Sequence, residues 1–226
     1  MIKVELHAHT SDDPADRIPH STLALLERAS ASGYGALAIT LHNRWFDPSP
    51  WDSHARTLGV TLLSGIEKSI EGRHILAINV PREVEQARTF DDLRAIKRHA
   101  PDSLYVAPHP FYPIPSALGP LMDDLSDLID VVEINAMYTS SLDFNRKARA
   151  WAAAHGVPLV GNCDLHRLDQ LGSTWTEVDA EPDADAICRA IKAGRVVVRT
   201  SPLSWARAVW TMVRMEIGGR GRSHLR

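Results

Sequence analysis

Eight short apolar segments recur along this chain with helical patterns between most of them, and this alternation restricts the possible folds more than any other feature. The predicted strands are residues 2–6, 36–40, 60–66, 74–80, 104–108, 130–135, 157–162 and 195–200. Several of their cores are apolar without alternation, which is typical of parallel strands covered on both faces. The predicted helices are residues 21–32, 90–100, 142–155, 183–193 and 204–216. The pattern predicts an α/β fold, a distorted TIM-like (β/α) barrel of about seven units.

One segment departs from this alternation. The sequence Ser-Ile-Glu-Gly-Arg-His-Ile-Leu, with Glu71 and Gly72 at its centre, predicts a tight hairpin and hence one antiparallel strand. We expect residues 1–203 to form a single domain. Residues 204–226 are expected to add a C-terminal helix followed by a basic, disordered tail.

Charge and composition exclude several classes of protein. The net charge is −3 over 226 residues, so no general positive field favours a nucleic-acid partner, and none is expected. Two cysteines cannot form a disulfide framework, which favours a reducing compartment. The chain opens directly as a strand and has no long apolar run, so we expect a cytoplasmic protein without a membrane partner.

Two pairs of metal-binding side chains lie at predicted strand ends. His7 and His9 are two residues apart, so both imidazoles point to one face of a strand. Asp164 and His166 repeat this spacing near the other end of the chain. Because the first and last strands of a closed barrel are neighbours, the two pairs should converge. Taken alone, each pair could equally be two surface residues.

Further histidines and carboxylates occupy similar places. They are His42, Glu67, His74 and His109, together with Asp12 or Asp13 in the loop after His9. A glutamate directly after a buried strand is costly unless it is paired or binds a metal, and its two oxygens can bridge two ions. Mixed histidine and carboxylate ligands suit zinc, manganese or iron. The sequence therefore predicts a cluster of divalent metal ions and no organic cofactor.

Read in order, the segments ELHAHTSDD, ALAITLHN, SGIE, RHIL, APHP, EIN and NCDLH resemble the motifs of the PHP (polymerase and histidinol phosphatase) family of metal-dependent phosphoesterases. The resemblance covers residues 2–166, with a final unit to about residue 203. It implies a (β/α)7 barrel with two or three metal ions. It also implies three ligand sets: His7, His9, Glu67 and Asp164; His42, His166 and an acidic residue; and Glu67 with His74 and His109.

This chain departs from the family pattern at three places. Glu5 and Leu41 each replace an aspartate, and the loop after His9 has Ser-Asp-Asp-Pro instead of Ser-Asp-Gly. The change in the loop leaves open which aspartate completes the second set. We favour Asp13 over Asp12 because its spacing from His7 is closer to that of the family.

The resemblance implies hydrolysis of a phosphate ester in a small molecule, such as a phosphorylated metabolite or a nucleotide, by a metal-bridging hydroxide. Asp164 and His166 are then expected at the reaction centre, with either His166 or a metal-bound water as the proton donor to the leaving oxygen. Arg44 and Lys68, each next to an expected ligand, are candidate phosphate clamps. Two alternatives remain: a metal-dependent hydrolase of the amidohydrolase type, and a metal-binding accessory domain that does not catalyse a reaction.

Overall fold

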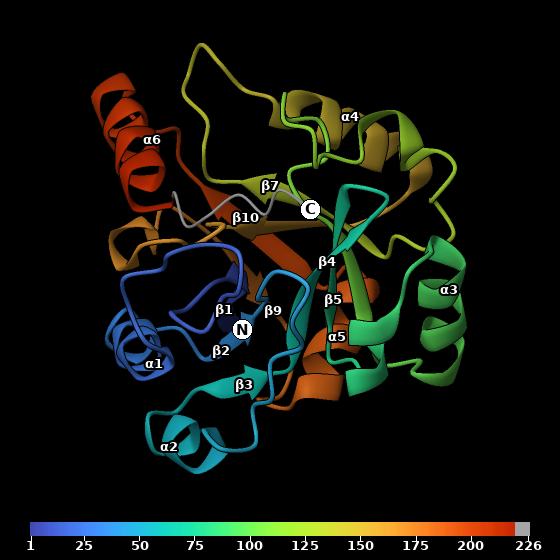
Figure 1. Cartoon of the computed structure of the whole chain (residues 1–226), viewed down its shortest axis with the longest axis horizontal. Coiled ribbons are helices and arrows are strands. Elements are labelled where there is room, and N and C mark those ends of the chain that lie inside the picture. Colours follow the sequence, from blue (N-terminus) through green and yellow to red (C-terminus); the bar gives the residue numbers. More distant parts are fainter. Residues whose placement is uncertain (220–226) are drawn as a thin grey trace.

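Two mixed five-stranded sheets form the framework of the chain (Figure 1). The structure is a computed structural model and describes residues 1–219, with side chains as far as Arg214. The first sheet has the order β10-β9-β1-β2-β3, and the second has the order β4-β5-β6-β7-β8. The bounds in the first sheet are β1 (Ile2–Ala8), β2 (Ala36–Ile39), β3 (Thr61–Leu63), β9 (Thr174–Val178) and β10 (Val196–Thr200). Those in the second are β4 (Gly65–Ile70), β5 (Arg73–Ile78), β6 (Leu104–Ala107), β7 (Val131–Asn135) and β8 (Leu159–Asn162).

The predicted distorted TIM-like (β/α)7 barrel is wrong, because neither sheet closes. Antiparallel pairs interrupt the parallel order: β4 and β5 form a hairpin, and β9 and β10 are antiparallel neighbours joined through a helix (Ala184–Lys192). Side chains bridge much of the remaining gap between the sheets. The Asn162 carboxamide accepts from the amide N–H of Leu6, and the Thr176 hydroxyl accepts from that of Gly161. Such bonds satisfy backbone groups without a continuous ladder, so the sheets can face each other and still stay open.

The predicted hairpin is confirmed. Strands β4 and β5 are antiparallel, with Ile70 opposite Arg73. The two turn residues both have positive φ, 52° at Glu71 and 75° at Gly72, as a tight two-residue turn requires. Glycine adopts this conformation without steric cost, which explains its place in the turn.

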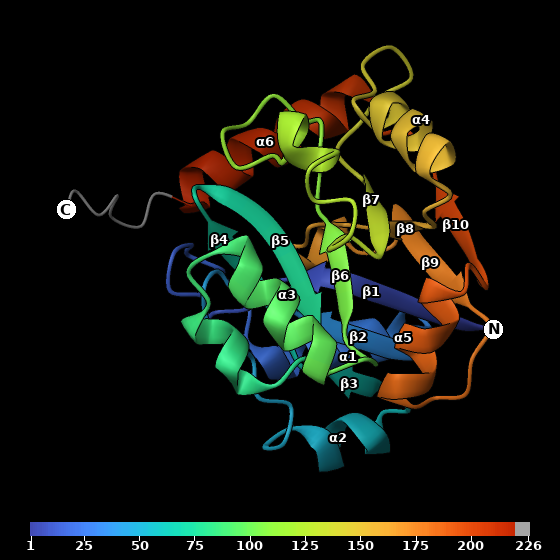
Figure 2. The ribbon, with the colours of Figure 1, turned by 90° about the vertical axis from the view of Figure 1, so that its right-hand side faces the viewer.

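Helices cover the outer faces of the sheets, as the two views show (Figures 1 and 2). Their bounds are α1 (Thr22–Ala31), α2 (Asp52–Thr57), α3 (Phe90–His99), α4 (Asn145–His155), α5 (Ala184–Lys192) and α6 (Trp205–Gly219), with short 3₁₀ helices η1 (Arg82–Gln86), η2 (Gly119–Met122) and η3 (Leu168–Gln170). Local signals set several ends: Ser21 caps α1, Thr89 and Asp92 form a capping box on α3, and Gly156 ends α4 in the left-handed conformation. These ends agree closely with the predicted helices.

One apolar core lies between the sheets. Val4 and Leu6 of β1 pack in the same cluster as Leu76 of β5, Val106 of β6 and Val160 of β8. A second cluster packs α3 and α4 on the β4–β8 sheet, and a third packs α1 on β2. The core therefore fixes the position of the strands whose ends carry the predicted metal-binding residues.

Sequence patterns missed two elements and merged two others. Strand β9 and helix α2 were not predicted. The predicted strand 60–66 divides at Ser64 into β3 and β4, which belong to different sheets. The C-terminal helix is present as α6, whereas residues 220–226 of the predicted tail lie outside the described part of the chain. No helix in residues 1–219 has the length and apolar character needed to cross a bilayer.

Candidate metal centre

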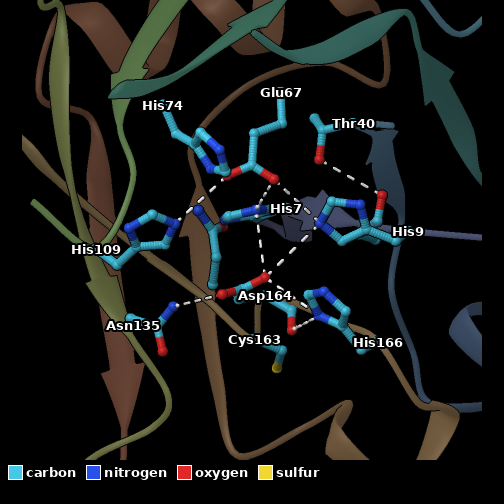
Figure 3. A network of polar contacts seen from close by, with 12 residues as sticks. His7, His9, Thr40, Glu67, His74, His109, Asn135, Cys163, Asp164 and His166 are labelled. Carbon is cyan, nitrogen blue, oxygen red and sulfur yellow. Dashed lines mark hydrogen bonds and ion pairs between the residues drawn. The ribbon is translucent and has the colours of Figure 1, made fainter. Parts of the chain in front are cut away.

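Residues from both sheets converge on one buried cluster of imidazoles and carboxylates (Figure 3). His7 lies near the end of β1, and His9 is the first residue after this strand. Asp164 and His166 follow β8. The backbones of these two segments pair with each other, because His9 donates its amide N–H to Leu165 and Leu165 donates to His7. The two pairs therefore meet, although no barrel closes.

Glu67, on β4, lies at the centre of the cluster and is 1% exposed. Its Oε2 atom lies 3.3 Å from His7 Nε2, 3.4 Å from His9 Nε2 and 3.2 Å from His42 Nε2. Its Oε1 atom faces a different pair, at 2.6 Å from His74 Nδ1 and 3.4 Å from His109 Nε2. The two oxygens thus serve two groups of imidazoles, as expected of a carboxylate that bridges two ions.

Asp164 completes the first group. Its Oδ1 atom lies 3.4 Å from His7 Nε2, 3.7 Å from His9 Nε2 and 3.4 Å from His166 Nδ1. Four ligand atoms placed tetrahedrally about 2.0–2.1 Å from a zinc ion would lie roughly 3.3–3.4 Å apart. His7 Nε2, His9 Nε2 and Glu67 Oε2 form one compact candidate metal-binding group, and Asp164 Oδ1 lies 3.4 Å and 3.7 Å from the two histidines, distances that suit a shared metal ion.

Two residues of the cluster have strained backbones. Asp164 has φ of 51° and His109 has φ of 32°. A non-glycine residue in this region costs about 1–3 kcal/mol and persists where the surroundings impose it. His109 lies between Pro108 and Pro110, which restrict the backbone on both sides. The strain coincides with residues whose side chains point into the cluster (Figure 3).

Asp13, the favoured aspartate of the loop after His9, lies beside its expected partner His42 and forms a compact candidate metal-binding group with His42 and His9. Asp13 Oδ2 lies 3.0 Å from both His9 Nδ1 and His42 Nδ1, and it also accepts from the His42 amide N–H. It therefore contacts the ring nitrogens opposite those that face Glu67. Asp12 does not reach these histidines, and its Oδ2 accepts from Thr22 Oγ1 at 3.4 Å.

Asp16, which sequence analysis missed, is the carboxylate that faces both histidines of the second set. Its Oδ2 atom lies 3.1 Å from His166 Nε2 and 3.9 Å from His42 Nδ1. Among residues 1–219, no compact group of three metal-binding residues contains both of these histidines. The only sequence signal for Asp16 is its position three residues after Asp13, whose Oδ1 accepts the Asp16 amide N–H.

Two buried carboxylates support the cluster from outside. Glu133 Oε2 lies 2.8 Å from His7 Nδ1, which fixes the ring so that Nε2 faces Glu67 and Asp164. Glu5 accepts from the amide N–H groups of His7 and Cys163, and burial raises the pKa of Glu5 to about 8. The glutamate at position 5 thus links the two strand ends that carry the histidine and aspartate pairs.

The electrostatics of the cluster call for positive charge. Burial raises the pKa of Glu67, but the imidazoles of His7, His109 and His74 outweigh it and hold this pKa well below its ordinary value. Burial lowers the pKa of His7, yet Asp164 and the neighbouring glutamates outweigh it and raise this pKa well above its ordinary value. Either protons on the imidazoles or metal cations can supply that charge.

The residues present fit metal ions. His9 Nε2 is buried and has no hydrogen-bond partner, although it faces two carboxylates. The donors are the imidazoles and carboxylates that zinc, manganese and iron use. Once a metal ion replaces the proton on Nε2, the His7 ring, with Nδ1 held by Glu133, would present the Nε2 lone pair to that ion.

The two predicted phosphate clamps differ in position. Arg44 is exposed, donates to the backbone oxygen of Asp12, and lines a pocket of about 350 Å³ together with Leu41 and Trp51. Lys68 points to the opposite face of β4 from Glu67, because neighbouring residues alternate along a strand. Its Nζ atom donates to the backbone oxygen of Glu85 at 2.7 Å. The structure therefore turns Lys68 away from the cluster, and the pocket beside Arg44 contains none of the candidate metal-binding residues.

Known proteins resemble this chain in part of its sequence and in its fold. Residues 143–196 match the family model described as PHP-associated. No curated protein matches the chain in a sequence search. The match to the PHP-associated family model, together with the fold shared with the solved structures below, confirms the resemblance to the PHP family.

Three solved structures share the fold. A two-domain protein of Bacteroides vulgatus that contains a predicted PHP-like metal-dependent phosphoesterase is 18% identical, with a TM-score of 0.68 over 95% of this chain and 69% of that chain. A lesion-specific endonuclease of Pyrococcus furiosus is 17% identical, with a TM-score of 0.59 over 93% and 66%. An amidohydrolase of Chromobacterium violaceum is 14% identical, with a TM-score of 0.56 over 90% and 99%. The endonuclease weakens the prediction that nucleic acid is not a partner, since this fold also serves an enzyme acting on nucleic acid.

Proposed function

We propose that this chain is a metal-dependent phosphoesterase that hydrolyses a phosphate ester of a small molecule. The observation that carries the proposal is the convergence of His7, His9, Glu67 and Asp164 at distances that fit a metal ion, with the second oxygen of Glu67 facing His74 and His109. We propose that these two groups hold two ions and that Glu67 bridges them.

Bound divalent ions would supply Lewis-acid activation of water and of the phosphoryl group. The protein residues have distinct tasks around that chemistry. Glu133 keeps His7 in the tautomer that presents Nε2, and Asp13 orients His9 and His42 through their Nδ1 atoms. This assignment makes Asp13 a positioning residue and makes Asp16 the carboxylate that orients His166.

We assign proton transfer to His166. Its Nε2 atom faces Asp16, and its side chain is 17% exposed, more than those of His7 and His9. Burial lowers the pKa of His166, but Asp16 and Asp164 outweigh it and raise this pKa above its ordinary value. A protonated imidazole at the rim is suited to protonating the leaving oxygen of the ester. Arg44, an exposed guanidinium two residues after His42, is suited to binding a phosphoryl oxygen.

The amidohydrolase alternative has less support from the site. That chemistry is expected to use a carboxylated lysine as the bridging group. In residues 1–219, the candidate metal-binding groups contain the carboxylate of Glu67 in the bridging position, and Lys68 lies on the other face of β4. The site therefore favours the phosphoesterase.

The experiment measures metal content and hydrolysis in parallel. Protein purified without added metal is analysed by plasma mass spectrometry and assayed with p-nitrophenyl phosphate, bis-p-nitrophenyl phosphate and an amide substrate. We expect bound metal and phosphate-ester hydrolysis in the wild type, and loss of hydrolysis in Asp164→Asn. Asp124→Asn is the matched control, because Asp124 is exposed and lies outside the candidate metal-binding groups.

Two results would contradict the proposal. One is a wild-type protein that stays free of metal after incubation with zinc, manganese and iron, which would favour the accessory domain. The other is an Asp164→Asn variant that hydrolyses the esters at the wild-type rate. Hydrolysis of the amide alone would favour the amidohydrolase.

A further inference from the structure

A polar cavity of about 640 Å³ lies beside β4 and contains none of the candidate metal-binding residues, although Asn43 and Ser69 of its lining are close to them in the sequence. Lys68 lines it, and this side chain shares its face of β4 with Ile66 and Ile70, which are buried in the core. The 3₁₀ helix η1 and the residues after it form the opposite wall, with Arg82, Glu85 and Arg88. Volumes of roughly 300–1,000 Å³ are typical of small-molecule sites.

Lys68 is a buried cation without a matching charge. It is 2% exposed, and its only hydrogen bond in the described chain goes to the backbone oxygen of Glu85. No carboxylate in residues 1–214 forms an ion pair with it. An ammonium group has three N–H donors, so two remain for other acceptors. Burial, and then the nearby Arg88, lower the pKa of Lys68, while Glu85 acts in the opposite direction.

The other charges around the cavity do not neutralise this lysine. Arg82 and Arg88 are exposed cations, and Glu83 and Glu85 are the two acidic residues. Arg82 Nε and Glu85 Oε2 lie 3.8 Å apart, so the acidic side chain closest to Lys68 already has a partner. Three cationic side chains thus line the cavity with two carboxylates, so the lining has one unneutralised positive charge that a bound anionic group would balance.

We propose that this cavity binds the phosphate or carboxylate group of a small molecule, with Lys68 as the buried donor and Arg82 and Arg88 at the entrance. Such a group would accept from the two free donors of the ammonium and from a guanidinium, the pairing that favours phosphate and carboxylate over chloride. The site does not rest on the proposed function, because it shares no residue with the metal centre. Arg82 and Glu85 also line the neighbouring pocket that contains Arg44.

The test is a calorimetric titration of the full-length protein with inorganic phosphate. The wild type should show a binding site that Lys68→Gln weakens by about tenfold or more, because hydrogen bonds to charged groups are the strong ones. Arg88→Gln should weaken the same site. Arg98→Gln, an exposed arginine on α3 outside the cavity, is the matched control and should bind as the wild type does.

The Asp164→Asn variant separates this site from the metal centre. Phosphate binding that survives Asp164→Asn and disappears in Lys68→Gln supports the proposal, even if the metal centre proves inactive. A raised KM with unchanged kcat in Arg88→Gln would show that the anionic group belongs to the substrate, whereas unchanged kinetics would show a separate ligand. The thermal midpoint of Lys68→Gln checks its folding, and the exposed Arg88 provides the test if that variant does not fold. Equal phosphate binding in the wild type and Arg88→Gln, or no phosphate binding in the wild type, would overturn the proposal.

Discussion

Replacing Glu133 by glutamine should weaken metal binding, although the residue is not a predicted ligand. Glu133 is fully buried and accepts from four donors. Its Oε2 atom accepts from His7 Nδ1 at 2.8 Å and Asn162 Nδ2 at 3.0 Å. Its Oε1 atom accepts from the His109 amide N–H at 3.1 Å and Asn135 Nδ2 at 2.9 Å. Glutamine has nearly the same shape but replaces one of these oxygens with an amide NH₂ group.

The loss of metal affinity in Glu133→Gln depends on which of the two carboxylate oxygens the NH₂ group replaces. If the NH₂ group replaces Oε2, His7 must turn its Nδ1 atom into an acceptor, and Nε2 then carries the proton and cannot bind a metal. If it replaces Oε1, it faces the His109 amide N–H, which cannot change. A buried polar group without a partner costs about 1–3 kcal/mol. Loss of such a supporting carboxylate typically lowers metal affinity by roughly 10–100-fold.

The assay is a competition between the protein and a chromophoric chelator for zinc, with Glu133→Gln compared with Glu27→Gln. Glu27 is exposed on α1 and controls for the loss of one negative charge. The thermal midpoint of the metal-free protein should also fall, by about 2–4 °C for each kcal/mol in a chain of this size. If Glu133→Gln bound zinc as tightly as Glu27→Gln, the role assigned to this carboxylate would be refuted.

Three further changes test other parts of the structure. Asp13→Asn should weaken zinc binding by about 10–100-fold, since Asp13 orients two histidines, while Asp12→Asn should leave it unchanged in the same chelator assay. Burial lowers the pKa of His20 from 6.5 to about 4. Between pH 6.5 and pH 4 the folded state therefore binds fewer protons at this residue than the unfolded state, so the free energy of unfolding decreases as the pH falls from 6.5 to 4. The glutamine in His20→Gln can still donate to the His9 carbonyl but does not titrate, so this variant should avoid up to about 3 kcal/mol of that decrease. Urea unfolding at several pH values measures this, and an equal pH dependence in the wild type and the variant would contradict it. Gly161→Ala would place a methyl group 2.9 Å from side chains of β9 and β10 and should cost about 1–3 kcal/mol, which chemical denaturation would detect; unchanged stability would mean that the sheets can move apart.

The convergence of the candidate site could be predicted because it depends on local signals. His7 and His9 end an apolar strand at the i, i+2 spacing, and so do Asp164 and His166. For His7 and His9 that spacing places both side chains on one face. Asp164 and His166 follow β8, and the pairing of Leu165 with the backbone of His7 and His9 holds their segment in place. The prediction of the hairpin at Glu71 also rested on adjacent residues alone, and the structure confirms it.

The sheet topology could not be predicted in the same way. The run from Val60 to Ile66 is mostly apolar, and its short Ser-Gly step did not predict that one sheet ends before Ser64 and the other begins at Gly65. At Gly65 a side chain would come within 2.7 Å of the Ile39 carbonyl oxygen, a contact between distant segments that periodicity cannot reveal. Strand β9 was missed although Thr174, Thr176 and Val178 alternate as buried residues, because threonine does not stand out as apolar.

The position of Asp16 was hidden for a related reason, since its partner His166 lies 150 residues away in the sequence. Lys68 shows the opposite error. Its place next to Glu67 suggested a common function, but adjacent residues in a strand face opposite sides. The strand geometry that unites His7 with His9 therefore separates Glu67 from Lys68.

The error about the barrel did not remove the convergence, because isolated backbone bridges join the two sheets at the metal centre, Ala8 with Leu165 and His42 with Glu67. Outside the named strands, the backbone bridge between β1 and the segment after β8 pairs Ala8 with Leu165. Each of these two residues lies between the members of a metal-binding pair. The bridge thus fixes the spacing of the two pairs directly, whereas farther along the strands side chains such as Asn162 span the gap. Since Glu67 comes from the second sheet and His7 and His9 from the first, ions in this cluster would link the open sheets where their backbones already meet.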